Sequence, residues 1–239
     1  MVRGGGLTHL WRTENRVVKP GDFRDVYVNP AEEFARMMRA GTLARVAHGY
    51  YVLVPEEQRG DYWQPEVEGV ALGIAVADYG RDVVALMGPA AARMLGAIPR
   101  ALATATIAIP RQRPAVTTTV GRVQFVTRTV ARLDTQRVTT EITTGWMTTP
   151  EQTALDLADR PGLGGAGPAT IEEAIRALAP RCDPPLVERL ARAQHKLAGW
   201  QRYCWIAGLP ALPVHADVPT RGLHAQVDPA VYGLVETAS

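Results

Sequence analysis

Four side chains near the N-terminus have the type and spacing that phosphate binding requires: Arg36, Arg39, Arg45 and His48. Arg36 and Arg39 lie three positions apart in a segment of helical periodicity, so their side chains share one helix face. A guanidinium group contacts two phosphate oxygens at once, and phosphate contacts supply much of a protein's affinity for nucleic acid. We therefore predict a nucleic-acid contact through these four residues. The alternative is a solvated helix face on a fold that binds another protein.

A second group of arginines lies in the middle of the chain, where Asp134 is the only acidic residue between positions 100 and 137. Arg111 and Arg113 fall in a predicted loop. Arg122 and Arg128 are an even number of positions apart in a strand-like segment, so they share a predicted sheet face. This basic interaction face has three interpretations: an extension of the nucleic-acid contact, a contact with an acidic partner or its nucleic-acid substrate, or an ordinary solvated surface.

No group of residues has the spacing of a catalytic or metal-binding site. The histidines have no metal-ligand spacing, and Cys182 and Cys204 fit no zinc motif, so we expect reduced thiols. A nuclease needs clustered carboxylates and a lysine to hold Mg²⁺ and activate water, but Lys196 has no acidic pair near it. We expect Asp156, on a predicted helix, to hold neighbouring backbone or an arginine. The prediction is therefore no catalytic site, no metal and no cofactor.

The residues around Arg36 and Arg39 carry the signals that begin and end a helix. Asn29 is a good N-cap, Pro30 suits the first helical position, and Gly41 suits the position after the last turn. Strands are predicted over 42–46 and 50–54, with the turn His48-Gly49 between them. This order is the second half of a winged helix-turn-helix, with the helix as the reader and the hairpin as the wing.

Two details of this predicted module concern its front helix and its second strand. The usual long first helix of the motif is at best residues 7–15. Tyr50 and Tyr51 alternate across the strand, so we expect one in the core and the other exposed.

The rest of the chain predicts a larger domain with helices before and after a β-rich centre. Thr149 as N-cap and Pro150 at the first position begin the first helix after the strands. Helices are expected over 66–79, 89–95, 150–158, 170–178, 184–197 and 197–206, and strands over 83–87, 102–109, 116–119, 122–129, 137–142 and 143–147. The expected fold class is α/β (α+β): a winged helix-turn-helix domain over 1–58, then a mixed-sheet domain with flanking helices and a tail over 59–239.

Two segments carry a resemblance to a known family. Residues 40–53 (AGTLARVAHGYYVL) resemble the wing signature x-G-x-L-x-R-V-x-x-G-x-Y-x-L of AbiEi antitoxins, and residues 144–158 (TGWMTTPEQTALDLA) resemble a later segment of the same proteins. With the β pattern between them, the resemblance covers roughly 17–206. It implies an antitoxin of a type IV toxin–antitoxin system, which represses its own operon through the winged helix and counters a toxin of nucleotidyltransferase fold.

The implied partners are operator DNA and the cognate toxin, with self-association on DNA. One departure from the family pattern is the acidic pair Glu32 and Glu33 at the start of the predicted reading helix, which would repel phosphate unless it serves the helix dipole. Two alternatives therefore remain: a winged-helix regulator without a toxin, and an interaction module that has lost DNA binding. No apolar stretch approaches the roughly 20 residues that span a bilayer, so we expect a cytoplasmic protein without membrane contact.

Overall fold

The computed structural model describes residues 14–60 and 63–210. The N-terminal part comprises strand β1 (Val17–Val18), the 3-10 turn η1 (Pro20–Phe23), helix α2 (Pro30–Arg39), and the hairpin of β2 (Leu43–Ala47) and β3 (Tyr50–Leu53). The three strands form an antiparallel sheet in the order β1-β3-β2. The predicted helix and hairpin are present, whereas nearly all of the predicted first helix, residues 7–15, lies outside the described residues.

The signals at the ends of α2 act as predicted. The Asn29 side chain accepts a hydrogen bond of 3.4 Å from the backbone N–H of Glu32. After the last turn, Gly41 has a φ of +68°, a left-handed conformation in which a Cβ would be strained. The chain can therefore reverse directly from α2 into β2.

Both faces of the small sheet are covered, because helix α3 (Val67–Tyr79) packs on the face opposite α2. Successive strand side chains point to opposite faces. The α2 side receives Val18, Leu43 and Leu53; the α3 side receives Val17, Val46 and Val52. Tyr50 and Tyr51 are consequently both half-buried. The expectation that one of them is exposed is wrong, because it assumed one open face.

Helix α3 is buried over a continuous run, Val67 to Ala75, because it lies between two sheets. Such a helix is apolar on nearly all sides, and the exception in this run, Glu68, lies 3.3 Å from Arg93. It approaches the small sheet closely at Gly73, where an added Cβ would clash with the Cγ2 atom of Val17. Gly73 therefore sets how closely the N-terminal part can dock.

The central sheet is mixed, as predicted. Its six strands lie in the order β6-β7-β5-β4-β9-β8, in which β4–β9 and β5–β7 are parallel and the other neighbours antiparallel. The strands are β4 (Ala85–Leu86), β5 (Thr104–Ile109), β6 (Val116–Thr118), β7 (Gly121–Thr127), β8 (Thr135–Thr139) and β9 (Thr144–Thr148), with the 3-10 turns η2 (Glu56–Gln58), η3 (Arg81–Val83) and η4 (Val130–Arg132) between elements.

A second hydrophobic core lies among the C-terminal helices. Thr149 caps α5 by accepting a hydrogen bond from the Gln152 backbone N–H, and Pro150 occupies the first turn, as predicted. The helices are α4 (Gly88–Met94), α5 (Pro150–Asp159), α6 (Pro168–Leu178), α7 (Pro184–Ala193) and α8 (Leu197–Ala207), with the 3-10 turns η5 (Leu163–Gly165) and η6 (Ala179–Arg181).

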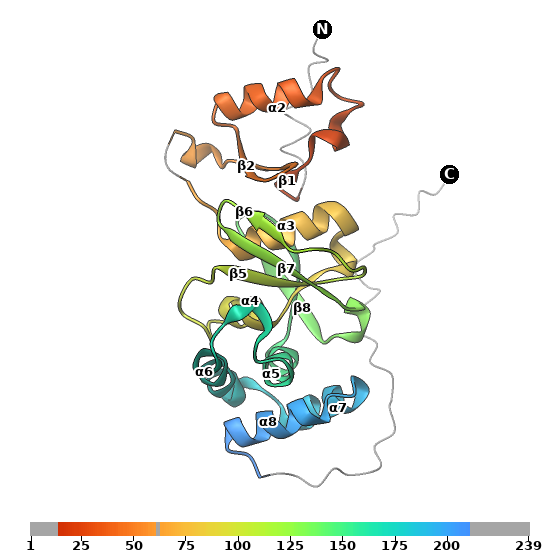
Figure 1. Cartoon of the computed structure of the whole chain (residues 1–239), viewed down its shortest axis with the longest axis vertical. Helices are drawn as coiled ribbons and strands as arrows, with labels where there is room; N and C mark the ends of the chain where they lie inside the picture. Colours follow the sequence, from red (N-terminus) through yellow and green to blue (C-terminus); the bar gives the residue numbers. More distant parts are fainter. Residues whose placement is uncertain (1–13, 61–62, 211–239) are drawn as a thin grey trace, which may run out of the picture.

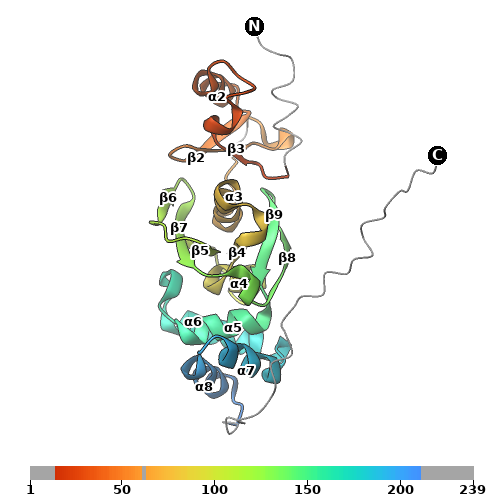
Figure 2. The same cartoon turned by 90° about the vertical axis from the view of Figure 1, so that its right-hand side faces the viewer.

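The layers stack along one long axis, with α2 at one end and α7 and α8 at the other (Figures 1 and 2). The predicted boundary between residues 58 and 59 does not separate two hydrophobic cores, because residues from both sides pack in one cluster around α3. Among the described residues, no helix is long and apolar enough to cross a bilayer.

Candidate nucleic-acid interface

The outer face of α2 carries Arg36 and Arg39, both exposed, while Phe34 and Met37 face the sheet. The Arg36 guanidinium is already paired, since its Nε and Nη2 atoms lie 3.0 and 2.9 Å from Oε2 of Glu33. The Arg39 Nε atom donates a long bond of 3.4 Å to the Ala35 carbonyl. Arg39 therefore offers its charge to solvent, whereas part of the Arg36 charge is neutralised on the same helix face.

The two acidic residues at the start of α2 have different contacts. Glu32 accepts a hydrogen bond of 3.1 Å from the Asn29 side-chain amide and so belongs to the helix cap. Glu33 pairs with Arg36. The first carboxylate serves the helix start, where the dipole favours negative charge, and the second pairs with an arginine of the predicted phosphate contact.

The hairpin places Arg45 on the same side of the small sheet as α2. Arg45 lies opposite Tyr51 in the β2–β3 ladder, and the Tyr51 ring contacts Phe34 of α2 edge-on, with the centroids 5.2 Å apart. The Arg45 Nη2 atom lies 3.1 Å from Nδ1 of His48, and both side chains are exposed. The structure thus brings Arg45 and His48 together and aims Arg45 toward the side that carries Arg36 and Arg39.

Behind the hairpin, the Asp78 carboxylate in the last turn of α3 accepts hydrogen bonds from three side chains. Its Oδ1 atom accepts from Lys19 Nζ at 3.1 Å, and its Oδ2 atom accepts from the Tyr50 hydroxyl at 2.7 Å and from Arg113. Arg113 also donates to the Tyr50 oxygen at 2.8 Å and lies 4.7 Å from the centroid of the Phe125 ring. This Asp78 cluster ties β3 and the start of η1 to α3 and the central sheet.

Burial alone would raise the pKa of the Asp78 carboxyl. Hydrogen bonds from Tyr50, Lys19 and Arg113 outweigh that effect and lower this pKa below its ordinary value. Two backbone bonds strengthen the same joint: Thr119 N–H to the Val46 carbonyl at 2.8 Å, and Arg16 N–H to the Ile142 carbonyl at 2.9 Å. The candidate interface is therefore held rigidly on the central domain.

The four arginines of the predicted basic face do not form one open surface. Arg111 and Arg122 are exposed, but Arg113 is drawn into the Asp78 cluster and Arg128 is half-buried with two guanidinium nitrogens enclosed. The β7 face that carries Arg122 and Arg128 is covered in part by η5, whose Gly164 N–H donates to Gln124 at 3.2 Å. The expectation of a shared basic face through all four residues is therefore wrong.

The expectation that Lys196 lacks acidic neighbours is also wrong in space. Lys196, at the start of α8, donates to the Asp156 carboxylate of α5 at 2.5 Å and lies 3.6 Å from Asp159. Gln152 donates to the same Asp156 oxygen at 3.2 Å. Burial raises the pKa of Asp156, and attraction by Lys196 offsets part of that rise. Asp156 is structural, as expected. It pairs with Lys196, 40 positions away, and the positive charge of Arg128 also acts to lower its pKa.

The Asp156–Lys196 pair is enclosed by the helices of the second core, with side chains only 1% and 5% exposed. Within residues 14–60 and 63–210, no three metal-ligating side chains are grouped closely enough to hold an ion. The contact joins α5 to the turn before α8, and so holds the C-terminal helices together.

Comparison with known proteins assigns the larger part of this structure. A family model described as the AbiEi antitoxin C-terminal domain matches residues 83–206, more than half of the chain. The chain belongs to the AbiEi antitoxin family. The match runs from the end of η3 through α8, so the family's antitoxin domain corresponds to β4–β9 and the helices α4–α8. Helix α2 and the β2–β3 hairpin lie outside the matched segment.

The fold of this AbiEi antitoxin also occurs in a solved structure. The crystal structure of the RV2827C protein from Mycobacterium tuberculosis is similar with a TM-score of 0.59 at 19% sequence identity, covering 84% of this chain and 74% of that chain. At this identity the likeness concerns the fold. No curated protein matches the sequence.

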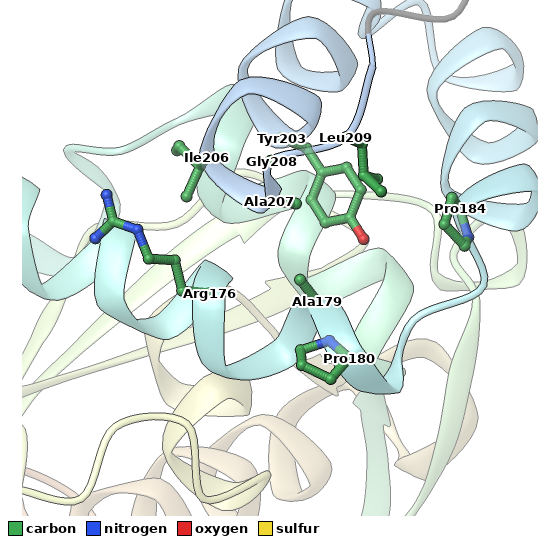
Figure 3. Close-up of a pocket in the computed structure, with 9 residues that line it drawn as sticks. All are labelled: Arg176, Ala179, Pro180, Pro184, Tyr203, Ile206, Ala207, Gly208 and Leu209. Carbon is green, nitrogen blue, oxygen red and sulfur yellow. The ribbon is translucent and has the colours of Figure 1, made fainter.

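The antitoxin domain has a mainly apolar pocket of about 450 Å³ at the end of α8 (Figure 3). In Figure 3 the Tyr203 hydroxyl points toward the other residues that line the pocket. The Tyr203 side chain itself is fully buried. Burial raises the pKa of Tyr203, and burial likewise raises that of the nearby Cys182 thiol to about 11. The residues around the pocket come from α6, η6, α7, α8 and the two residues after α8: Arg176, Ala179, Pro180, Pro184, Tyr203, Ile206, Ala207, Gly208 and Leu209.

Sequence reasoning missed the Asp78 cluster and the partner of Lys196. Tyr50 and Asp78 are 28 positions apart, and Asp78 and Arg113 are 35 apart. The only sequence signal for the Asp78 contacts is the presence of an acidic residue near the end of a helix whose one other acidic residue, Glu68, lies in its first turn. That signal marks a buried or paired carboxylate but names no partner.

Proposed function

We propose that this AbiEi antitoxin neutralises a toxin of nucleotidyltransferase fold in a type IV toxin–antitoxin system and represses its own operon by binding operator DNA. The observation that supports DNA binding is the exposed group of Arg36, Arg39 and Arg45 on one side of a helix–strand–strand unit. That order is the reader and wing of a winged helix-turn-helix. The carrying observation for neutralisation is the antitoxin domain over 83–206.

On this proposal the division of labour follows the predicted boundary, with DNA binding in 1–58 and antidote activity in 59–239. The position of α2 and the C-terminal helices at opposite ends of the long axis supports this division (Figure 1). Repressors with a reading helix bind inverted repeats as pairs, so two copies act on the operator. Both partners of the antitoxin, operator and toxin, place it in the cytoplasm.

The test of the repressor half is a mobility shift of the full chain on DNA upstream of its own gene, at low and moderate salt. We expect a specific shift that weakens as salt rises, because phosphate contacts release counterions. Expression together with the toxin encoded beside the antitoxin gene tests the other half, with restored growth as the expected result. No shift at micromolar protein, or no restored growth, would contradict the corresponding half.

The second candidate is a protein-interaction module whose wing no longer binds DNA. The pairing of Arg36 with Glu33 favours it, since this ion pair removes one arginine from phosphate contact. A chain that restores growth but never shifts DNA would support this candidate. Point substitutions separate the two activities better than truncation, because removing the N-terminal sheet would expose the apolar side of α3.

A further inference from the structure

The first turn of α2 carries an acidic residue on the same side as the predicted phosphate contacts. Glu32, Arg36 and Arg39 lie at positions i, i+4 and i+7, so one face of the helix presents all three. Their side chains are exposed, and the buried residues of α2 lie on the opposite side. Among the described residues, no other helix or strand covers this outer side (Figure 1). Val28, directly before the N-cap, is 98% exposed, so the beginning of the helix is uncovered as well.

The Glu32 carboxylate is held in place but is not neutralised. The Asn29 side-chain amide donates a hydrogen bond of 3.1 Å to its Oε2 atom. Glu33, by contrast, forms an ion pair of 2.9 Å with Arg36. Within residues 14–60 and 63–210, no cation lies at ion-pair distance from Glu32, and its Oε1 atom accepts no hydrogen bond. The side chain therefore keeps an unpaired negative charge, with one oxygen open to a ligand.

On the proposed function, this charge faces DNA. The N-terminal residues of a reading helix contact base edges in the major groove. Glu32, in the first turn, therefore lies nearer to the bases than Arg36 and Arg39, which follow it along the helix. A carboxylate at this place repels the phosphates of every sequence, and it gains a favourable contact only where a base offers a hydrogen-bond donor.

The four bases differ in what they offer to a carboxylate, which can only accept hydrogen bonds. In the major groove, cytosine presents its N4 amine, a donor, and no acceptor. Adenine presents the N6 donor beside the N7 acceptor, whereas guanine and thymine present acceptors. We propose that Glu32 reads a cytosine of the operator by accepting a hydrogen bond from its N4 amine. This inference rests on the proposed function, because it assumes that α2 lies in the major groove of operator DNA.

The two acidic residues of α2 then act differently on DNA binding. Glu32 attracts one base and repels the others, which gives specificity at the expense of general affinity. Glu33 acts only through the charge of Arg36, which it reduces equally for every sequence. Substitutions at the two positions should therefore have opposite effects on base preference.

The test is a series of mobility-shift titrations of the full chain on duplexes taken from the DNA upstream of its own gene. Each base pair of the bound site is replaced in turn. For the wild-type chain, we expect one C·G pair in each half-site whose replacement by T·A weakens binding at least about tenfold.

Glu32→Gln keeps the size of the side chain and an oxygen that can accept from Asn29, but it removes the charge and adds an amide donor. Glutamine pairs with the N6 and N7 atoms of adenine. The variant should lose the preference for cytosine at that pair and bind a duplex with adenine there at least as tightly. Its binding to DNA of unrelated sequence should become stronger, because a charge that repels phosphate is gone.

The matched control is Glu33→Gln, which removes the same charge from the neighbouring residue. It should strengthen binding to every duplex and leave the preference for cytosine unchanged, because it frees Arg36 without changing a base contact. Thermal melting of both variants checks that each is folded as the wild type is.

Two outcomes overturn this inference alone. If Glu32→Gln strengthens binding equally on every duplex, the carboxylate only repels phosphate. If the variant keeps the wild-type preference at every base pair, Glu32 does not reach the bases. In both cases a specific shift of the wild-type chain leaves the repressor function intact. A wild-type chain that gives no specific shift at low salt overturns the proposed DNA binding itself, and the inference with it.

Discussion

The Tyr50 hydroxyl of the β2–β3 hairpin donates a 2.7 Å hydrogen bond to Oδ2 of Asp78 in the last turn of α3. The same carboxylate holds Lys19 and Arg113. One residue of the long central helix therefore fixes the candidate DNA-binding side relative to the antitoxin domain.

Replacing Asp78 by asparagine should lower the free energy of unfolding by about 2 kcal/mol at neutral pH, because three donors lose a charged acceptor. The pKa of Asp78 is lowered in the folded protein. Its stabilisation is therefore complete above the unfolded pKa and is lost as pH falls through the lower folded pKa. Urea unfolding should show the wild-type advantage constant from neutral pH down to about pH 4 and shrinking below it.

The control for that series is Asp82→Asn, which changes an exposed carboxylate close to α3 in η3. It should leave unfolding nearly unchanged at every pH. An equal loss in both variants would mean that net charge, and not the Asp78 cluster, sets the pH dependence.

Tyr50→Phe should cost about 1 kcal/mol of stability, because one hydroxyl that both donates to Asp78 and accepts from Arg113 is lost while the ring stays. Thermal melting measures the loss. Tyr79→Phe is the matched change, since the Tyr79 hydroxyl makes no hydrogen bond within the described residues. If the Tyr50 variant is as stable as the Tyr79 variant, the Tyr50 hydroxyl does not stabilise the contact between the hairpin and α3.

Glu33→Gln should strengthen binding to operator DNA, because it frees the Arg36 guanidinium from its 2.9 Å ion pair. Arg36→Ala together with Arg39→Ala should weaken binding and make the dependence on salt less steep, by about 0.9 in log–log slope for each lost phosphate contact. Mobility shifts over a salt series measure both.

Two controls accompany the DNA series. Glu57→Gln removes an exposed carboxylate from η2, and Arg189→Ala removes an exposed arginine from α7 at the far end of the molecule. Neither should alter the affinity. If Glu33→Gln binds no better than Glu57→Gln, the Arg36 side chain does not contact phosphate.

Lys196→Met should destabilise the protein by about 3 kcal/mol, because it removes the cation that is hydrogen-bonded to the buried Asp156 carboxylate. Adding Asp156→Asn should recover much of the loss, since the remaining side chain is neutral and can still accept from Gln152. Chemical unfolding of the two single variants and the double variant gives the coupling energy. Additive losses would show that the two residues do not act as a pair.

Gly73→Ala should lower stability by about 2 kcal/mol, because its Cβ would clash with the Val17 side chain. Adding Val17→Ala should recover part of that loss by making room. Gly21→Ala, where an added Cβ meets nothing within 4 Å, is the control. If the Gly73 variant melts at the same temperature as the wild type, β1 can shift away from α3 without a loss of stability.

The local elements followed from the sequence because their signals are local. The N-caps Asn29 and Thr149 and the left-handed Gly41 act on residues within one helical turn. Strand alternation likewise predicted which β7 side chains share a face, with Val123 and Phe125 on the α3 side. The mixed sheet with flanking helices and the family could therefore be inferred from the chain alone.

The tertiary structure decided which of those faces are open and which charges are paired. The excess of arginine in this segment predicted a basic surface that included Arg113 and Arg128. Both are instead partly buried, Arg113 by its contact with Asp78 of α3 and Arg128 on the sheet face that η5 covers in part. Tyr50 contacts Asp78, and Lys196 contacts Asp156, only because elements distant in sequence pack together. Burial makes an unpaired charge costly, so these partners are imposed by the fold as a whole, which local sequence patterns do not encode.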